Sequence, residues 1–164
     1  MSSGKPRDAM PDELLAWLRG GRLVMGATVD AEGRPYTMVM NSVVAIDAQT
    51  LRFALDHRTH TLANLRERPS MMLEVVGDGF IYGIGGTARI AVERMEHAPV
   101  PSALVEVAVE TVKRDLPPGV EVAAPSFRWG ALEAYMTSVE PAMFGELRSW
   151  RADGIGDRSG GRAD

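Results

Sequence analysis

Three apolar stretches follow one another closely early in the chain, and the short turns between them restrict the fold more than any other feature. They cover residues 22–30, 36–46 and 51–55, and each is rich in residues that favour strands. The intervening segments 31–35 and 47–50 contain Gly, Pro and Asp residues that are typical of tight turns. Such connections are too short for the crossover that joins parallel strands, so we expect an antiparallel sheet.

A second pair of strands is expected after a short helix. The helix covers residues 59–67, and strands follow at residues 71–76 and 80–93. The last of these contains a glycine-rich stretch, residues 83–86, where a bulge or a close backbone approach is expected. Glycine breaks of this kind bend a long sheet toward a barrel.

The remainder of the chain predicts two helices and one further strand. Residues 12–18 form a short helix that ends at a glycine pair, and residues 131–140 return as a strand. In residues 102–116 the apolar positions fit one helical face, which favours a helix. Valine at every second position from Val105 to Val109 is also compatible with a strand.

The predicted fold is therefore mainly β, a barrel of six antiparallel strands with peripheral helices. At 164 residues the chain is long enough for one domain with a substantial core. We place this domain at residues 11–150, with a flexible lead-in at 1–10 and a flexible tail at 151–164.

Composition excludes several classes of function. The net charge of −4, with basic residues scattered among acidic ones, gives no footprint for nucleic acid. The chain contains no cysteine, so disulfide, thiolate and cysteine-ligated metal chemistry are excluded. No apolar run approaches the ~20 residues that cross a bilayer, and we expect no membrane partner and a cytoplasmic protein.

The candidate site begins where the third predicted strand ends. Residues 53–65 pass from an apolar strand end through a polar turn with Arg58 and into a helix start. The first turn of a helix presents unpaired N–H groups and a positive dipole end, so an arginine and hydroxyls there suit a phosphate. The same residues also fit a simple threonine N-cap beside a solvated charge.

Two sequence motifs carry a resemblance to a known family. Residues 27–36 read Ala-Thr-Val-Asp-Ala-Glu-Gly-Arg-Pro-Tyr, and residues 61–69 read Thr-Leu-Ala-Asn-Leu-Arg-Glu-Arg-Pro. In this order and separation, they resemble the split β-barrel of the pyridoxamine 5′-phosphate oxidase-like flavoproteins over residues 12–142. The resemblance implies a homodimer with flavin mononucleotide (FMN) at the interface and a small-molecule substrate.

The same resemblance implies a set of cofactor-binding residues. The isoalloxazine ring would lie along Met38, Val39, Met40 and Asn41. The phosphate would be surrounded by Arg58, Thr59, His60, Thr61 and Asn64. Trp129, next to Arg128, fits either a surface cation–π pair or a contact to the partner's flavin.

The chain departs from many of these flavoproteins at the phosphate. It has Thr59-His60-Thr61 where Ser-Arg-Lys or Lys-Thr is common, so at least one permanent positive charge is missing. Deazaflavin, haem or no cofactor therefore remain alternatives to FMN.

The functional hypothesis is an FMN-dependent oxidoreductase acting on a small molecule, with a non-catalytic flavin, deazaflavin or haem carrier as the alternative. No recognisable acid–base pair or nucleophile motif is present, so no catalytic residue is named. His57 and His60 lack a third ligand at a recognised spacing, so no metal site is expected.

Overall fold

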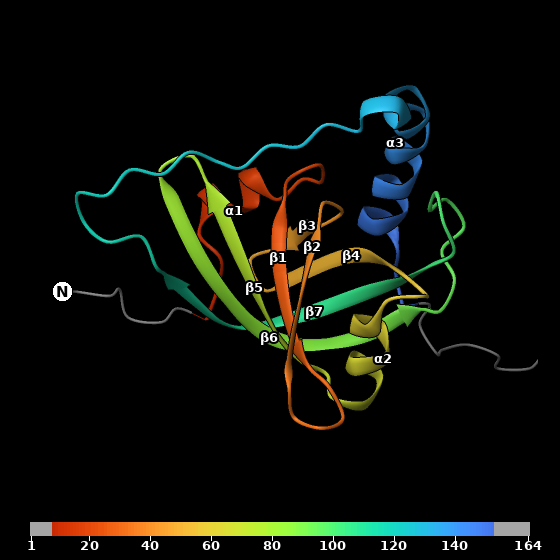
Figure 1. Ribbon diagram of the computed structural model, residues 1–164, viewed down its shortest axis with the longest axis horizontal. Coiled ribbons are helices and arrows are strands. Elements are labelled where there is room, and N and C mark those ends of the chain that lie inside the picture. The colour runs from red at the N-terminus through yellow and green to blue at the C-terminus, as the bar shows by residue number, and fades with distance from the viewer. Residues whose placement is uncertain (1–7, 153–164) are drawn as a thin grey trace, which may run out of the picture.

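The computed structural model describes residues 8–152, and the predicted lead-in and tail fall mostly outside this range (Figure 1). Seven strands form one antiparallel sheet with the order β2-β1-β5-β6-β7-β4-β3. In chain order the elements are α1 Asp12–Trp17, β1 Val24–Val29, β2 Pro35–Met40, β3 Val44–Asp47, β4 Thr50–Asp56, α2 His60–Glu67, β5 Ser70–Gly77, β6 Phe80–Val92, β7 Ser102–Arg114, η1 Gly130–Leu132 and α3 Glu133–Ser149. The mainly β antiparallel prediction is confirmed, with seven strands in place of six.

Both predicted hairpins are present. β1 pairs with β2 around the turn at Gly33, and β5 pairs with β6. The expected bulge also occurs, because the β6–β7 register shifts between Gly85 and Gly86. A Cβ on Gly86 would lie 2.3 Å from the Ala108 carbonyl oxygen, so β7 can approach closely only because this residue has no side chain.

The predicted helix at residues 102–116 is wrong, because this segment forms strand β7. β7 lies between β4 and β6 in the sheet and is buried on both faces at its start. Val105 and Val107 face the main core, while Leu104 packs in a second cluster beneath α3. Burial on both faces removes the clean apolar–polar alternation of a strand, and this made the segment resemble a helix.

The single strand predicted at residues 36–46 is also wrong, since it divides into β2 and β3. The division falls at Ser42, whose Oγ donates to the Ala54 carbonyl oxygen and accepts from the Ala54 N–H, both at 3.1 Å. A side chain therefore replaces the backbone ladder at this point. β2 and β3 end at opposite edges of the sheet.

The strand predicted at residues 131–140 is wrong as well. Residues 115–129 form an extended connection that runs the length of the molecule from β7, and the chain then enters η1 and α3 (Figure 1). α3 contains Pro141 in its interior, which the sequence interpretation took as the end of a strand. It buries only a narrow stripe, formed by Met136, Met143 and Leu147.

The hydrophobic core consists of two clusters on opposite faces of the sheet. The larger contains Phe53, Leu73 and Ile84 from the strands together with Leu14 and Leu18 beside α1. The smaller lies between the sheet and α3. Met10 belongs to the larger cluster, and its N–H donates to the Ala48 carbonyl oxygen at 2.8 Å, so the chain is attached to the barrel from this residue onward.

A buried arginine anchors α3 to the sheet. Arg52 on β4 is 8% exposed, and its Nη1 donates to the carbonyl oxygens of Leu147 at 3.0 Å and Trp150 at 2.8 Å. Its Nε also donates to Glu106 on β7 at 2.7 Å, and Arg89 on β6 binds the other oxygen of the same carboxylate. Burial alone would raise the pKa of Glu106, but the hydrogen bonds from both arginines outweigh it and lower that pKa.

Replacing Arg52 with alanine should lower the free energy of unfolding by about 3 kcal/mol, because Glu106 and two helix-end carbonyls lose a buried donor. Arg89→Ala is the matched control, since that side chain is 57% exposed and should cost about 1 kcal/mol or less. Urea unfolding of both variants measures the difference. Equal losses would contradict the role of Arg52 as the anchor.

Candidate functional site

One groove collects most of the residues that the sequence predicts at a ligand. Its volume is about 530 Å³, and it lies where the end of β2 and the end of β4 meet the first turn of α2. Its other wall comes from η1, α3 and the start of β7. The side chains that line the groove are mostly apolar and include Met38, Met40, Leu55, Trp129, Leu132, Tyr135, Met136 and Met143.

The structure brings six of the ten predicted cofactor residues to this groove. They are Met38, Val39, Met40, Asn41, Thr59 and Trp129. β2 is an edge strand of the sheet, so the backbone edge that does not pair with β1 has no neighbouring strand among the described residues. The groove therefore combines an apolar wall with a strand edge that is open to a ligand.

The remaining predicted residues, Arg58, His60, Thr61 and Asn64, lie outside the groove lining. The His60 ring contacts Tyr36 in a tilted arrangement, with ring centroids 5.5 Å apart and an interplanar angle of 57°. Thr61 is buried at 1% exposure, and its Oγ1 has no hydrogen-bond partner within the described residues. Thr61 therefore faces the core rather than the solvent.

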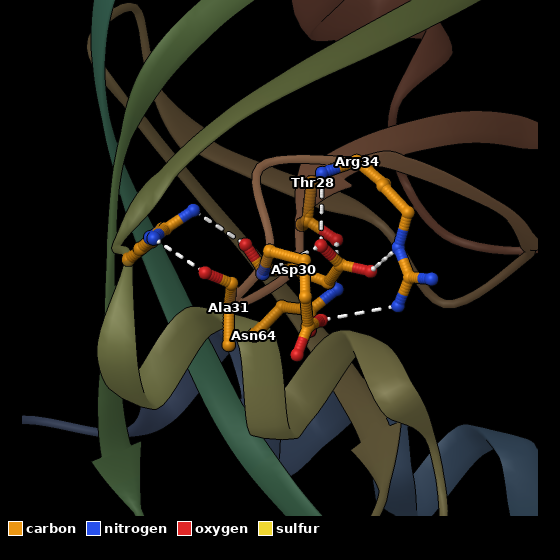
Figure 2. Close-up of polar contacts among 7 residues, drawn as sticks. Thr28, Asp30, Ala31, Arg34 and Asn64 are labelled. Carbon is orange, nitrogen blue, oxygen red and sulfur yellow. Dashed lines mark hydrogen bonds and ion pairs between the residues drawn. The ribbon is translucent and has the colours of Figure 1, made fainter.

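Asn64 serves the packing of α2 against the first hairpin. Its Nδ2 donates to the Thr28 Oγ1 on β1 at 3.0 Å (Figure 2). One turn further along, Arg68 donates to the carbonyl oxygens of Asp30 and Ala31 in the hairpin turn. The two motifs that carry the sequence resemblance thus bind each other and fix the position of α2.

Thr59 caps α2, as its residue type predicts. Its Oγ1 accepts from the Leu62 N–H at 3.3 Å and donates to the Asp56 carbonyl oxygen at 2.8 Å. The cap satisfies the Leu62 N–H at the start of the helix, and Thr59 itself lines the groove.

Arg58 stands beside this helix start and is engaged by Asp56. Its guanidinium binds the carboxylate through Nη2 at 2.6 Å and Nε at 3.1 Å. The hydrogen bond from the Arg58 side chain lowers the pKa of Asp56, and the same contact raises the pKa of Arg58. The Arg58 side chain is 80% exposed, so solvent screens the ion pair and its contribution to stability is small.

The sequence interpretation missed the wall that α3 contributes. Tyr135, Met136 and Met143 line the groove, and Glu140 reaches the same region from the helix. The Asn41 Nδ2 donates to Glu140 Oε1 at 3.3 Å. Burial raises the pKa of Glu140, while hydrogen bonds from the Trp129 indole and Asn41 oppose the rise. Met136 and Met143 are seven residues apart, which is about two helical turns. This spacing is the sequence signal that could have predicted a helix here.

The residues present fit a flavin in outline. The apolar wall and the open edge of β2 suit a flat ring with polar atoms along one side. Arg58 and the free N–H groups of α2 suit a phosphate, although no lysine, arginine or histidine lines the groove itself. Haem fits less well, because no histidine lines the groove to serve as an axial ligand.

A match to a protein-family model identifies the family of this chain. The model described as pyridoxamine 5′-phosphate oxidase matches residues 10–128, most of the chain. The chain belongs to the pyridoxamine 5′-phosphate oxidase family. This confirms the resemblance stated from the two motifs. No curated protein matches the chain in a comparison of sequences.

Solved structures share the split-barrel fold of the family at low identity. HupZ from Group A Streptococcus is 23% identical, with a TM-score of 0.58, and the match covers 70% of this chain and 99% of that one. An FMN-binding protein from Syntrophomonas wolfei is 18% identical, with a TM-score of 0.51 and coverage of 65% and 89%. The haem storage protein HutZ from Vibrio cholerae is 13% identical, with a TM-score of 0.50 and coverage of 64% and 94%.

Residues 8–152 contain neither a metal-binding cluster nor a membrane-spanning helix. No group of three or more histidine, cysteine, aspartate or glutamate side chains is placed to hold a metal ion there. No helix in the same range has the length and apolarity that a membrane span requires.

Proposed function

We propose that this family member binds FMN in the groove and uses it as an oxidoreductase on a small molecule. One observation carries the proposal: the end of the edge strand β2 and Thr59, the N-cap residue of α2, line the same groove, so one ligand can contact both. Flavin supplies hydride-transfer chemistry when bound. The chain supplies the position of the ring and the phosphate, and the apolar wall keeps water from the ring.

Arg58 is the residue that we propose for the phosphate. In the structure it binds Asp56, but exposed ion pairs of this kind contribute little to stability. A phosphate brings more negative charge than one carboxylate and can accept both ends of the guanidinium fork. We therefore expect Arg58 to turn from Asp56 to the phosphate when FMN binds.

A carrier without turnover is the second candidate, and the state of Arg58 favours it. A guanidinium already bound to Asp56, with no cation in the groove lining itself, gives a weaker phosphate site than a pair of free basic residues would. Deazaflavin offers a flat ring and a phosphate as well, so it fits the same residues.

The purified full-length chain, mixed with FMN and desalted, should retain flavin and its visible absorption. Riboflavin, which has the same ring without phosphate, should be retained less well if α2 and Arg58 bind the phosphate. Equal retention would show that the phosphate lies elsewhere, and no retention of either flavin would remove the proposed function.

Two further measurements separate the candidates. Reduction of the bound flavin by a nicotinamide donor and its reoxidation separate an enzyme from a carrier. A Soret band after haem titration would favour haem.

Arg58→Ala should weaken FMN binding about tenfold or more and leave riboflavin binding nearly unchanged, because only FMN offers a phosphate to the guanidinium. Asp56→Asn should act in the opposite direction by releasing Arg58. Arg66→Ala is the matched control, since Arg66 lies on α2, close to Arg58 in sequence, but pairs with Glu93. Fluorescence titration gives the affinities. An unchanged FMN affinity in Arg58→Ala would place the phosphate elsewhere.

We also propose that the working unit is a homodimer formed through the outer face of the sheet. Val39, Met72 and Met25 are 62%, 51% and 44% exposed. Cross-strand pairing places Val39 opposite Met25, and Met72 opposite Ala27 two residues along β1, so all three side chains lie on one face. A contiguous apolar patch on a sheet is typical of an interface.

Val39→Glu should convert the dimer to a monomer, because it places a charge within the apolar patch. Val120→Glu is the control, as Val120 is equally apolar and 50% exposed but lies on the connection between β7 and η1. Analytical ultracentrifugation of both variants measures the effect. A native chain that sediments as a monomer, or a Val39→Glu variant that remains dimeric, would contradict this interface.

A further inference from the structure

The groove is unusual in the state of its hydrogen-bond donors. Each side chain that lines the groove and carries a donor already forms at least one hydrogen bond within the chain. The pairs are Asn41 with Glu140, Ser42 with the Ala54 carbonyl oxygen, Thr59 with that of Asp56, Ser102 with that of Val100, Tyr135 with that of Pro99, and Trp129 with Glu140. Apart from the second N–H of the Asn41 amide, a ligand at this wall therefore meets mainly acceptors.

The charged side chains at the groove are acidic. Asp56 lines the groove, Glu140 is bound to Asn41 and Trp129, which line it, and no basic side chain is in the lining. Asp56 is neutralised by Arg58, whereas Glu140 has no basic partner among residues 8–152 and accepts only from the neutral Asn41 and Trp129. Glu140 is thus a partly buried carboxylate whose negative charge lacks a cation.

The walls around Glu140 suit a large apolar group. Met40, Met136 and Met143 are buried there, and methionine side chains adapt readily to different shapes. Trp129 and Tyr135 add aromatic surface at the same end of the groove. The face of an aromatic ring attracts cations, and the attraction grows when water is excluded.

We propose that the α3 end of the groove binds a small organic cation with an apolar body, its positive centre facing Glu140 and the aromatic surfaces of Trp129 and Tyr135. A cation supplies the charge that Glu140 lacks, and an apolar body fills the wall that the methionines form. This deepens the proposed function, since it names the class of small molecule that would lie beside the ring. Any reaction of the bound cation depends on the proposed function, but the binding of the cation does not.

The test compares three probes of similar size on the purified full-length chain by calorimetric titration. Benzyltrimethylammonium carries the cation, neopentylbenzene is its neutral isostere, and phenylacetate is an anion. The cation should bind at least tenfold more tightly than either of the others. Glu140→Gln should remove this preference without weakening the neutral probe, and Glu140→Asp, which keeps the charge, should retain most of it.

Glu67→Gln is the matched control, because Glu67 is exposed at the end of α2 and away from α3. It should leave the preference unchanged. A native chain that shows no preference for the cation, or a preference that survives in Glu140→Gln, would overturn the inference. FMN binding by the same samples is measured separately. A chain that binds no FMN but prefers the cation would contradict only the proposed function.

Discussion

The contact between Arg52 and the end of α3 determines whether this chain has a groove at all. The helix buries only a narrow stripe of side chains, so its own packing gives limited attachment to the sheet. Arg52 donates to the last carbonyl groups of α3 from the sheet face that this helix covers, and Glu106 on the neighbouring strand holds the guanidinium in place. The indole of Trp150 covers the cluster, with its ring centroid 5.1 Å from the guanidinium carbon of Arg52. One buried charged cluster therefore holds the wall that carries Glu140.

The parts of the fold that could be predicted from the sequence are those whose signals are local. Turn residues define the β1–β2 and β5–β6 hairpins, and a glycine pair marks the bulge at Gly85-Gly86. β7 lacked such a signal, because a central strand buried on both faces presents apolar residues at nearly every position of its first half. Its pairing with β6, the preceding strand, and with the more distant β4 outweighs local preference, and only tertiary structure shows that.

The candidate site, too, could be predicted only in part. The end of β2 and the cap Thr59 were predicted and line the groove, since both follow directly from the order of the strands. Asn64 was assigned to the phosphate, but its amide binds Thr28, so part of the motif marks how α2 is held rather than what α2 binds. Glu140 was missed because Pro141 was interpreted as the end of a strand, whereas the segment forms a helix that continues past it.

The charges at the two ends of the groove also orient what it holds. Arg58 and the free N–H groups of α2 favour negative charge at one end, while Glu140 favours positive charge at the α3 end. In the proposed complex, a flavin placed in reverse would bring its phosphate toward a carboxylate without a cation, which repulsion disfavours. In that complex the phosphate would lie at α2, the ring along the edge of β2, and the substrate in the space next to α3. The same asymmetry would allow one groove to accept an anionic cofactor and a cationic small molecule without either displacing the other.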